Sequence, residues 1–142
     1  MSKPHQIDVK HLLENYSANF DTGFIFKITD GEPIGSIYYN GSTRYRVYSR
    51  INGITYPNHR LLWAMWNECD VPVGFDIKHI NKNQMDNRLI NLSAASRTGS
   101  LKHRKSYREE IWKLIDEAEE LAGSPLPYKN VENYRKVLAG AE

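Results

Sequence analysis

Arginine and tyrosine side chains are concentrated in the first half of this sequence, and together they can bind nucleic acid. From Pro33 to Asn67 the chain has four arginines and no acidic residue. A guanidinium group pairs well with phosphate, and tyrosine rings beside it suit contacts with bases. The tyrosines closest to these arginines are Tyr38, Tyr39, Tyr45 and Tyr48.

A second group of basic residues without acidic neighbours follows Ser96. Across the two groups, the residues expected to contact phosphate are Arg44, Arg46, Arg60, Arg97, Lys102, Arg104 and Lys105. The plainer alternative is a solvated basic surface. Because the excess is rich in arginine and mixed with tyrosine, nucleic acid is the expected partner class.

The net charge of +2 hides an uneven distribution along the chain. Residues 1–108 have 15 Lys and Arg against 9 Asp and Glu, whereas residues 109–142 have 4 against 8. A basic body of this kind attracts a phosphate backbone through counterion release. The acidic end offers a different surface, one suited to a protein partner.

A series of short motifs between His59 and Ser100 carries the most specific signal. In chain order they are His59-Arg60-Leu61-Leu62-Trp63, Pro72-Val73-Gly74, His79-Ile80-Asn81, Asp86-Asn87-Arg88 and Asn91-Leu92. This series resembles the HNH nuclease family, in particular small phage and prophage members related to homing endonucleases. The resemblance extends roughly from Gly23 to Ser100, so phage or prophage origin is expected from it.

The resemblance implies a ββα-metal fold, in which two short strands and a helix hold one divalent cation. The histidine that acts as general base on water in this family aligns with His79. The asparagine that braces the loop by side-chain hydrogen bonds aligns with Asn91. An active member would use Mg²⁺ to stabilise charge on the phosphate and the leaving oxygen.

The two principal metal ligands of the family are replaced in this chain. Lys78 stands where the family usually has Asp, and Ser100 stands where it usually has Asn or His. An ammonium group repels a cation, and a serine hydroxyl is a poor ligand. Lys78 would instead bind a phosphate directly. No cofactor is therefore expected, although the fold-bearing residues around the two lost ligands are kept.

Two residues could rebuild a metal site. Asp76 precedes Lys78 by two positions, and His103 follows Ser100 by about one helical turn. A shifted site of Asp76, His79 and His103 would then hold Mg²⁺. The preferred interpretations are plainer: a surface charge at a strand end for Asp76, and an exposed residue on a basic helix for His103.

Hydrophobic periodicity predicts the elements that would position these residues. The expected helices are Ile7 to Tyr16, capped by Asp8, His59 to about Asn67, a basic helix from Ser96, Ser106 to Gly123, and a last one from about Asn130. The expected strands are Phe24–Ile28, Gly35–Tyr39, Tyr45–Ile51, Ile54–Tyr56, Phe75–Ile80 and Asn91–Ala95. His59 is expected to pack at a helix start, and Asn81, Asn83 and Asn87 to shape a loop. The tryptophans Trp63, Trp66 and Trp112 are expected in the core.

The predicted fold class is α+β: a small antiparallel sheet plus an HNH-like ββα-metal core, with C-terminal helices. The expected organisation is an N-terminal helical segment over 1–22, an HNH-like nucleic-acid-binding domain over 23–105, and an acidic helical extension over 106–142. A chain of 142 residues has room for one compact domain. Its single cysteine, Cys69, excludes an internal disulfide.

Targeting signals are not evident in the sequence. Residues 1–6 lack the apolar stretch of a secretory signal, and no apolar run approaches the length of a membrane span. A cytoplasmic protein without a membrane partner is therefore expected.

Three hypotheses remain open. The preferred one is an HNH-fold protein that binds nucleic acid, most simply double-stranded DNA, and has lost or greatly reduced its nuclease activity. The second is an active Mg²⁺-dependent nicking endonuclease with a rearranged site. The third is a nuclease-derived scaffold that binds and inhibits a host protein through residues 109–142.

Overall fold

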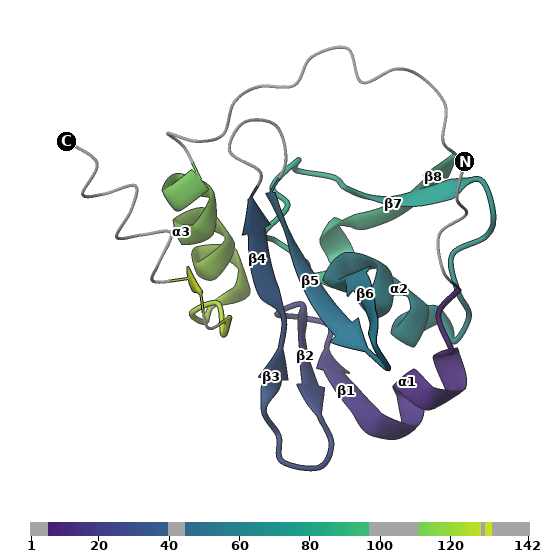
Figure 1. Ribbon diagram of the computed structural model, residues 1–142. Coiled ribbons are helices and arrows are strands. Elements are labelled where there is room, and N and C mark those ends of the chain that lie inside the picture. Colours follow the sequence, from purple (N-terminus) through teal and green to yellow (C-terminus); the bar gives the residue numbers. More distant parts are fainter. Residues whose placement is uncertain (1–5, 40–44, 97–110, 129, 132–142) are drawn as a thin grey trace.

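The computed structural model describes residues 6–39, 45–96, 111–128 and 130–131, and within them the chain has the predicted α+β fold (Figure 1). Three small antiparallel sheets and three α-helices make up this part. In chain order the elements are α1 Val9–Asn15, β1 Tyr16–Asn19, β2 Phe24–Lys27, β3 Pro33–Ile34, β4 Ser36–Tyr39, β5 Tyr45–Ile51, β6 Ile54–Pro57, α2 Asn58–Asn67, β7 Phe75–His79, the 3₁₀ turn η1 Leu89–Asn91, β8 Leu92–Ser96 and α3 Ile111–Ala122.

The first helix and the first sheet are joined without a loop. Asp8 caps α1, because its Oδ1 accepts a hydrogen bond from the backbone N–H of His11 at 3.1 Å. β1 follows α1 directly and pairs antiparallel with β2, which also pairs with β3. The N-terminal segment, expected to be helical, therefore also contains a strand.

The second sheet has the strand order β4-β5-β6, and the predicted strands Tyr45–Ile51 and Ile54–Tyr56 form a hairpin that turns at Asn52-Gly53. Asn52 and Gly53 have φ angles of 51° and 79°, the left-handed pair that a two-residue hairpin turn requires. Burial alternates along β5, so that one face of the sheet is in the core and the other is accessible.

The third sheet is the antiparallel pair β7 and β8, close to the predicted strands Phe75–Ile80 and Asn91–Ala95. Its register runs from Phe75 opposite Ser96 to His79 opposite Leu92. The basic helix that would complete a ββα unit falls in residues 97–110, outside the described residues.

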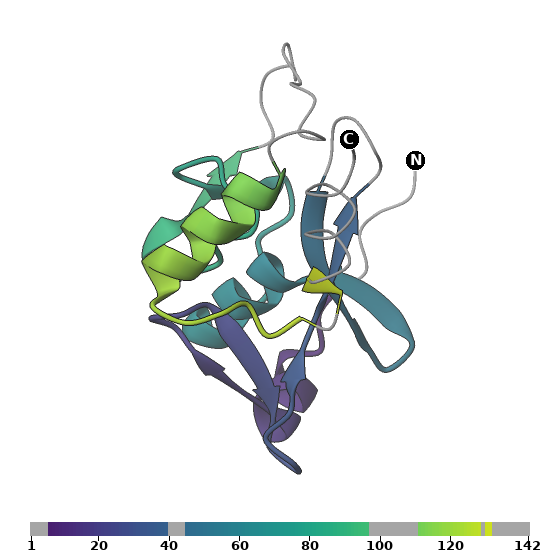
Figure 2. The ribbon, with the colours of Figure 1, turned by 90° about the vertical axis from the view of Figure 1, so that its left-hand side faces the viewer.

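Two hydrophobic clusters hold the elements together. In the first, Leu12 of α1 packs with Leu61 of α2 and Ile77 of β7. In the second, Ile115 of α3 packs with Val47 of β5. Figures 1 and 2 show α3 along one side of the molecule, next to β4. Both the N-terminal segment and α3 are therefore parts of the same packed body as the sheets.

The tryptophan prediction was wrong for Trp66. Trp66 is 57% exposed, because its side of the last turn of α2 lines an open groove, whereas Met65 beside it is buried in the core. Its ring instead packs edge to face on Phe20, with 4.9 Å between the ring centroids. Trp63 is partly buried against the first cluster, as expected, and the side chain of Trp112 lies outside the described residues.

Candidate functional site

Two buried histidines meet where α2 begins and β7 ends. His79 is the last residue of β7, and His59 is in the first turn of α2; each is 6% exposed. Their rings contact edge to face, with centroids 4.7 Å apart. The preferred sequence interpretation of His59, a packed histidine at a helix start, matches this position. The structure adds that His59 packs against His79.

Asn87 orients the ring of His79. The Nε2 atom of His79 lies 2.6 Å from Oδ1 of Asn87, and this hydrogen bond is buried. With the amide in this orientation, Nε2 carries the hydrogen and donates it, which leaves the lone pair on Nδ1. Asn87 was predicted only to shape the loop. Its position eight residues after His79 was the available signal, but sequence spacing does not reveal a side-chain contact.

Burial keeps both histidines neutral. Burial lowers the pKa of His59 well below the usual 6.5. Repulsion between the two rings when both would be protonated lowers this pKa further. Burial also lowers the pKa of His79, which the hydrogen bond to Asn87 partly offsets. The pair therefore has two uncharged imidazoles at neutral pH.

Arg46 places a positive charge near the pair. Its guanidinium lowers the pKa of both His59 and His79, and its side chain on β5 is only partly buried. Among the described residues predicted to bind phosphate, Arg46 acts on both histidines, whereas Arg60 acts on His59. Gln84, which the sequence did not single out, lies near His79 and raises its pKa.

Asn91 braces the loop that joins β7 to η1. Its Oδ1 accepts from the backbone N–H of Asn81 at 2.9 Å, and its Nδ2 donates to Asn81 Oδ1 and to the Asp86 carbonyl, both at 2.9 Å. Asn91 is 4% exposed, so these bonds are shielded from water. They hold the loop that carries Asn87, and through it the ring of His79.

Two further contacts hold this loop, and the sequence predicted neither. The hydroxyl of Tyr45 donates to the Lys82 carbonyl and accepts from the backbone N–H of Gln84. Gly23 packs against the backbone of Asn87 so closely that a Cβ there would lie 2.3 Å from the Asn87 carbonyl carbon. Gly23 also has a φ of +82°, which favours glycine.

Lys78 and Asp76 lie apart from the histidines. Both are exposed on β7, whereas Ile77 and His79 point into the core, as the alternation of a strand requires. Asp76 and His79 are therefore on opposite faces of β7. The structure does not bring these two members of the alternative metal site together.

Arg60, predicted as a phosphate ligand, is ion-paired within the fold. Its guanidinium makes hydrogen bonds of 2.9 to 3.2 Å to both carboxylate oxygens of Asp70. Asp70 also accepts from the backbone N–H groups of Ile7 and Val71. The pair connects α2 to the N-terminal segment. The other predicted site residues, Arg44, Arg97, Ser100, Lys102, His103, Arg104 and Lys105, lie outside the described residues.

The donors around His79 do not fit Mg²⁺, which prefers oxygen ligands. The carboxylate of Asp86 is close enough to His79 to raise its pKa, and Asp86 is only 2% exposed. Its oxygens already accept from Arg88 Nε and Nη2 and from Asn81 Nδ2, all at 2.8 Å. Within the described ranges, no three His, Cys, Asp or Glu side chains form a group that could hold a metal ion.

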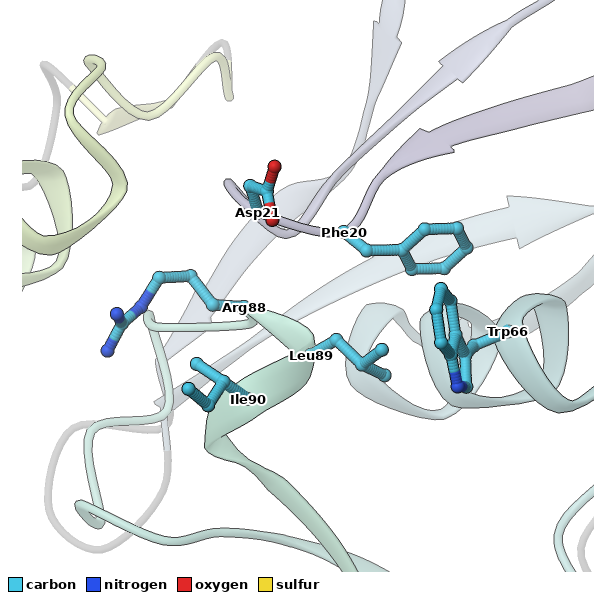
Figure 3. Close-up of a pocket in the computed structure, with 6 residues that line it drawn as sticks. All are labelled: Phe20, Asp21, Trp66, Arg88, Leu89 and Ile90. Atoms are coloured by element: carbon cyan, nitrogen blue, oxygen red, sulfur yellow. The ribbon is translucent and has the colours of Figure 1, made fainter.

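An apolar groove of about 370 Å³ lies beside α2 and η1 (Figure 3). Its lining residues are Phe20, Asp21, Trp66, Arg88, Leu89 and Ile90. Figure 3 shows Leu89 and Phe20 on two sides of Trp66, with Arg88 directed away from the aromatic rings. None of the predicted site residues lines this groove.

Comparison of the chain with protein-family models, with curated proteins and with solved structures finds no match in any of the three. Among the described residues, no helix is both long and apolar enough to cross a membrane.

Proposed function

We propose that this chain is a phage-type HNH-fold protein that binds nucleic acid and whose nuclease activity is lost or strongly reduced. The observation that carries the proposal is the environment of His79. The imidazole of His79 is buried, neutral and oriented by Asn87. The positive charge of Arg46 lies nearby, and the carboxylate near His79, that of Asp86, is already bound by Arg88. This environment favours a phosphate and disfavours a divalent cation.

Phosphate binding is supported by the charge balance around the histidines. Arg46 has no ion pair with a carboxylate of the described residues, unlike Arg60 and Arg88, whose guanidinium groups are engaged by Asp70 and Asp86. A guanidinium that is partly buried and lacks a carboxylate partner gains a strong, charge-assisted contact when a phosphate arrives. Lys78 is exposed on the opposite face of β7 from His79, so this support does not depend on it.

Loss of activity is supported by the burial of the general-base position. A base must reach the water from which it takes a proton, directly or through one further water. His79 is only 6% exposed, and one of its two nitrogens is occupied by Asn87. Without a divalent cation, the guanidinium of Arg46 would be left to offset the charge that develops on the phosphate and on the leaving oxygen.

Fluorescence anisotropy with a labelled DNA duplex tests the binding. We expect weak binding whose log affinity falls by about 0.9 per log unit of salt for each phosphate contacted. Arg46→Glu should weaken binding of the duplex. Lys27→Glu, the same charge change at the exposed last residue of β2, should have a much smaller effect. Absence of binding to this duplex at low salt would show that double-stranded DNA is not the partner.

A plasmid nicking assay with Mg²⁺ and with Mn²⁺ tests the activity. We expect negligible nicking by the unmodified protein and partial restoration by Lys78→Asp combined with Ser100→Asn. Robust cleavage that His79→Ala abolishes would instead establish the alternative, an active endonuclease with a rearranged metal site.

A second candidate function is a scaffold that binds and inhibits a host protein through residues 109–142. The observation that favours it is the surface of α3, which packs Ile115 and Ala118 into the core and exposes acidic residues. These exposed residues are Asp116, Glu117 and Glu120. Charge reversal at Glu117 and Glu120 would abolish such an interaction and leave DNA affinity unchanged or increased.

A further inference from the structure

The accessible face of the β4-β5-β6 sheet has an unusual composition. Residues that are directly opposite in antiparallel strands share a face, and the register pairs Tyr38 with Arg46, Ser36 and Pro57 with Tyr48, and Arg50 with Thr55. We call this surface the tyrosine face: Ser36, Tyr38, Arg46, Tyr48, Arg50, Thr55 and Pro57. It contains two tyrosines, two arginines and no acidic residue.

Two rings on the tyrosine face are held at a fixed angle. Tyr38 and Tyr48 are nearly perpendicular, at 85°, with their centroids 5.8 Å apart. Tyr48 is partly buried, whereas Tyr38 remains 52% exposed. A large aromatic ring that is both exposed and oriented by a neighbour loses little entropy when a flat ligand stacks on it.

The charges beside these rings select the kind of ligand. Arg46 lies directly across from Tyr38, and Arg50 is four residues further along β5 on the same face. Neither arginine is ion-paired with a carboxylate in the part of the chain that the structure describes. Stacking surfaces flanked by such cations bind the bases and phosphates of a single strand.

We propose that the tyrosine face binds an unpaired strand of nucleic acid, with one base stacked on Tyr38 and phosphates on Arg46 and Arg50. This inference rests on the proposed function and names the form of nucleic acid that the site takes.

An unpaired strand fits this face better than a duplex does. The bases of a duplex are already stacked on one another, so an open ring such as Tyr38 cannot stack on them. The major groove admits a helix or a two-stranded ribbon, whereas this sheet has three strands. A duplex would therefore contact the arginines through phosphates and leave Tyr38 unused.

The test compares labelled ligands by fluorescence anisotropy at about 50 mM salt, where phosphate contacts are strong. The ligands are an oligothymidylate of about 15 nucleotides, its abasic counterpart with the same phosphates, the matching oligouridylate and a duplex. We expect Tyr38→Ala to raise the Kd for oligothymidylate roughly 5- to 150-fold, the range measured when a stacking ring is removed. The abasic strand and the duplex should each have the same Kd for the unmodified protein and for Tyr38→Ala.

Two control variants separate stacking from other effects. Tyr38→Phe keeps the ring and should retain the affinity for oligothymidylate. Trp66→Ala removes an exposed ring from α2, outside the tyrosine face, and should leave the Kd for oligothymidylate unchanged. The oligouridylate shows whether the strand is DNA or RNA, since both offer a base to stack and only RNA has the 2′-hydroxyl.

The outcomes separate this inference from the proposed function. Equal binding of the abasic and intact strands, or an equal loss for both in Tyr38→Ala, would refute stacking while leaving nucleic-acid binding in place. Binding of the duplex alone would do the same. If none of the ligands binds, both the tyrosine face and the proposed function are wrong.

Discussion

Mild acid should destabilise this protein through its buried histidine pair. Burial lowers the folded-state pKa of His59 and His79 from the usual 6.5. An unfolded chain takes up protons on these residues as the pH falls through 6.5, whereas the folded chain does not. The free energy of unfolding therefore has its full value above pH 6.5. It decreases as the pH falls from 6.5 toward the lower folded-state pKa values.

The magnitude follows from the unfolded state. At about pH 5.5, an unfolded histidine binds about 0.9 proton, which stabilises the unfolded state by about 1.4 kcal/mol for each histidine that stays neutral in the fold. His59 has the more strongly lowered pKa. We therefore expect a loss of about 1.4 kcal/mol from His59 alone and about 2.8 kcal/mol if both remain neutral.

Urea unfolding at about pH 7.5 and about pH 5.5, followed by tryptophan fluorescence, measures this loss. His59→Gln replaces one imidazole by a group that does not titrate, so it should remove about half of the pH dependence or more. His11→Gln, which removes a histidine of α1 outside the pair, should retain it. If the free energy of unfolding is the same at both pH values, or if His59→Gln leaves the pH dependence intact, the account of the pair is wrong.

Three other predictions concern the contacts that hold the site. Gly23→Ala should lower the free energy of unfolding by more than about 3 kcal/mol, whereas Gly53→Ala, with a similar φ but open space, should cost only about 1 kcal/mol; urea unfolding compares the two. Asn91→Ala removes three hydrogen bonds from a buried loop and should cost about 1 to 3 kcal/mol in the same assay. Arg60→Ala should cost about 1 to 3 kcal/mol by leaving Asp70 without its partner, yet leave DNA affinity unchanged; a loss of DNA binding at unchanged stability would restore Arg60 as a phosphate ligand.

Several elements were predictable because short-range interactions specify them. The cap at Asp8, the turn at Asn52-Gly53 and the alternation of β5 each depend on residues a few positions apart. The strands β7 and β8 were also predicted to within one or two residues. The short strands β1 and β3 were missed, because strands of this length have too few residues to show a period and are held by their pairing with β2.

The candidate site depended much more on contacts between distant residues. The motif pattern singled out His79 and Asn91, and the charge pattern singled out Arg46. The packing of β5, α2 and β7 brings His79 against His59. It also brings Arg46 near enough to lower the pKa of both histidines. Sequence spacing could not predict these contacts, because they join residues 13 to 33 positions apart.

The amino-acid sequence by itself determined the α+β class, most of the elements and the types of side chain available for binding. Tertiary structure alone decided which of those side chains are accessible. Arg60 and Arg46 have the same chemistry, but Asp70 lies within reach of Arg60, while Arg46 remains without a carboxylate partner among the described residues. Trp66 is a large aromatic residue next to the buried Met65, but its side of α2 borders an open groove and stays exposed. Local sequence sets backbone preference and chemistry, whereas exposure and pairing depend on which elements pack against one another.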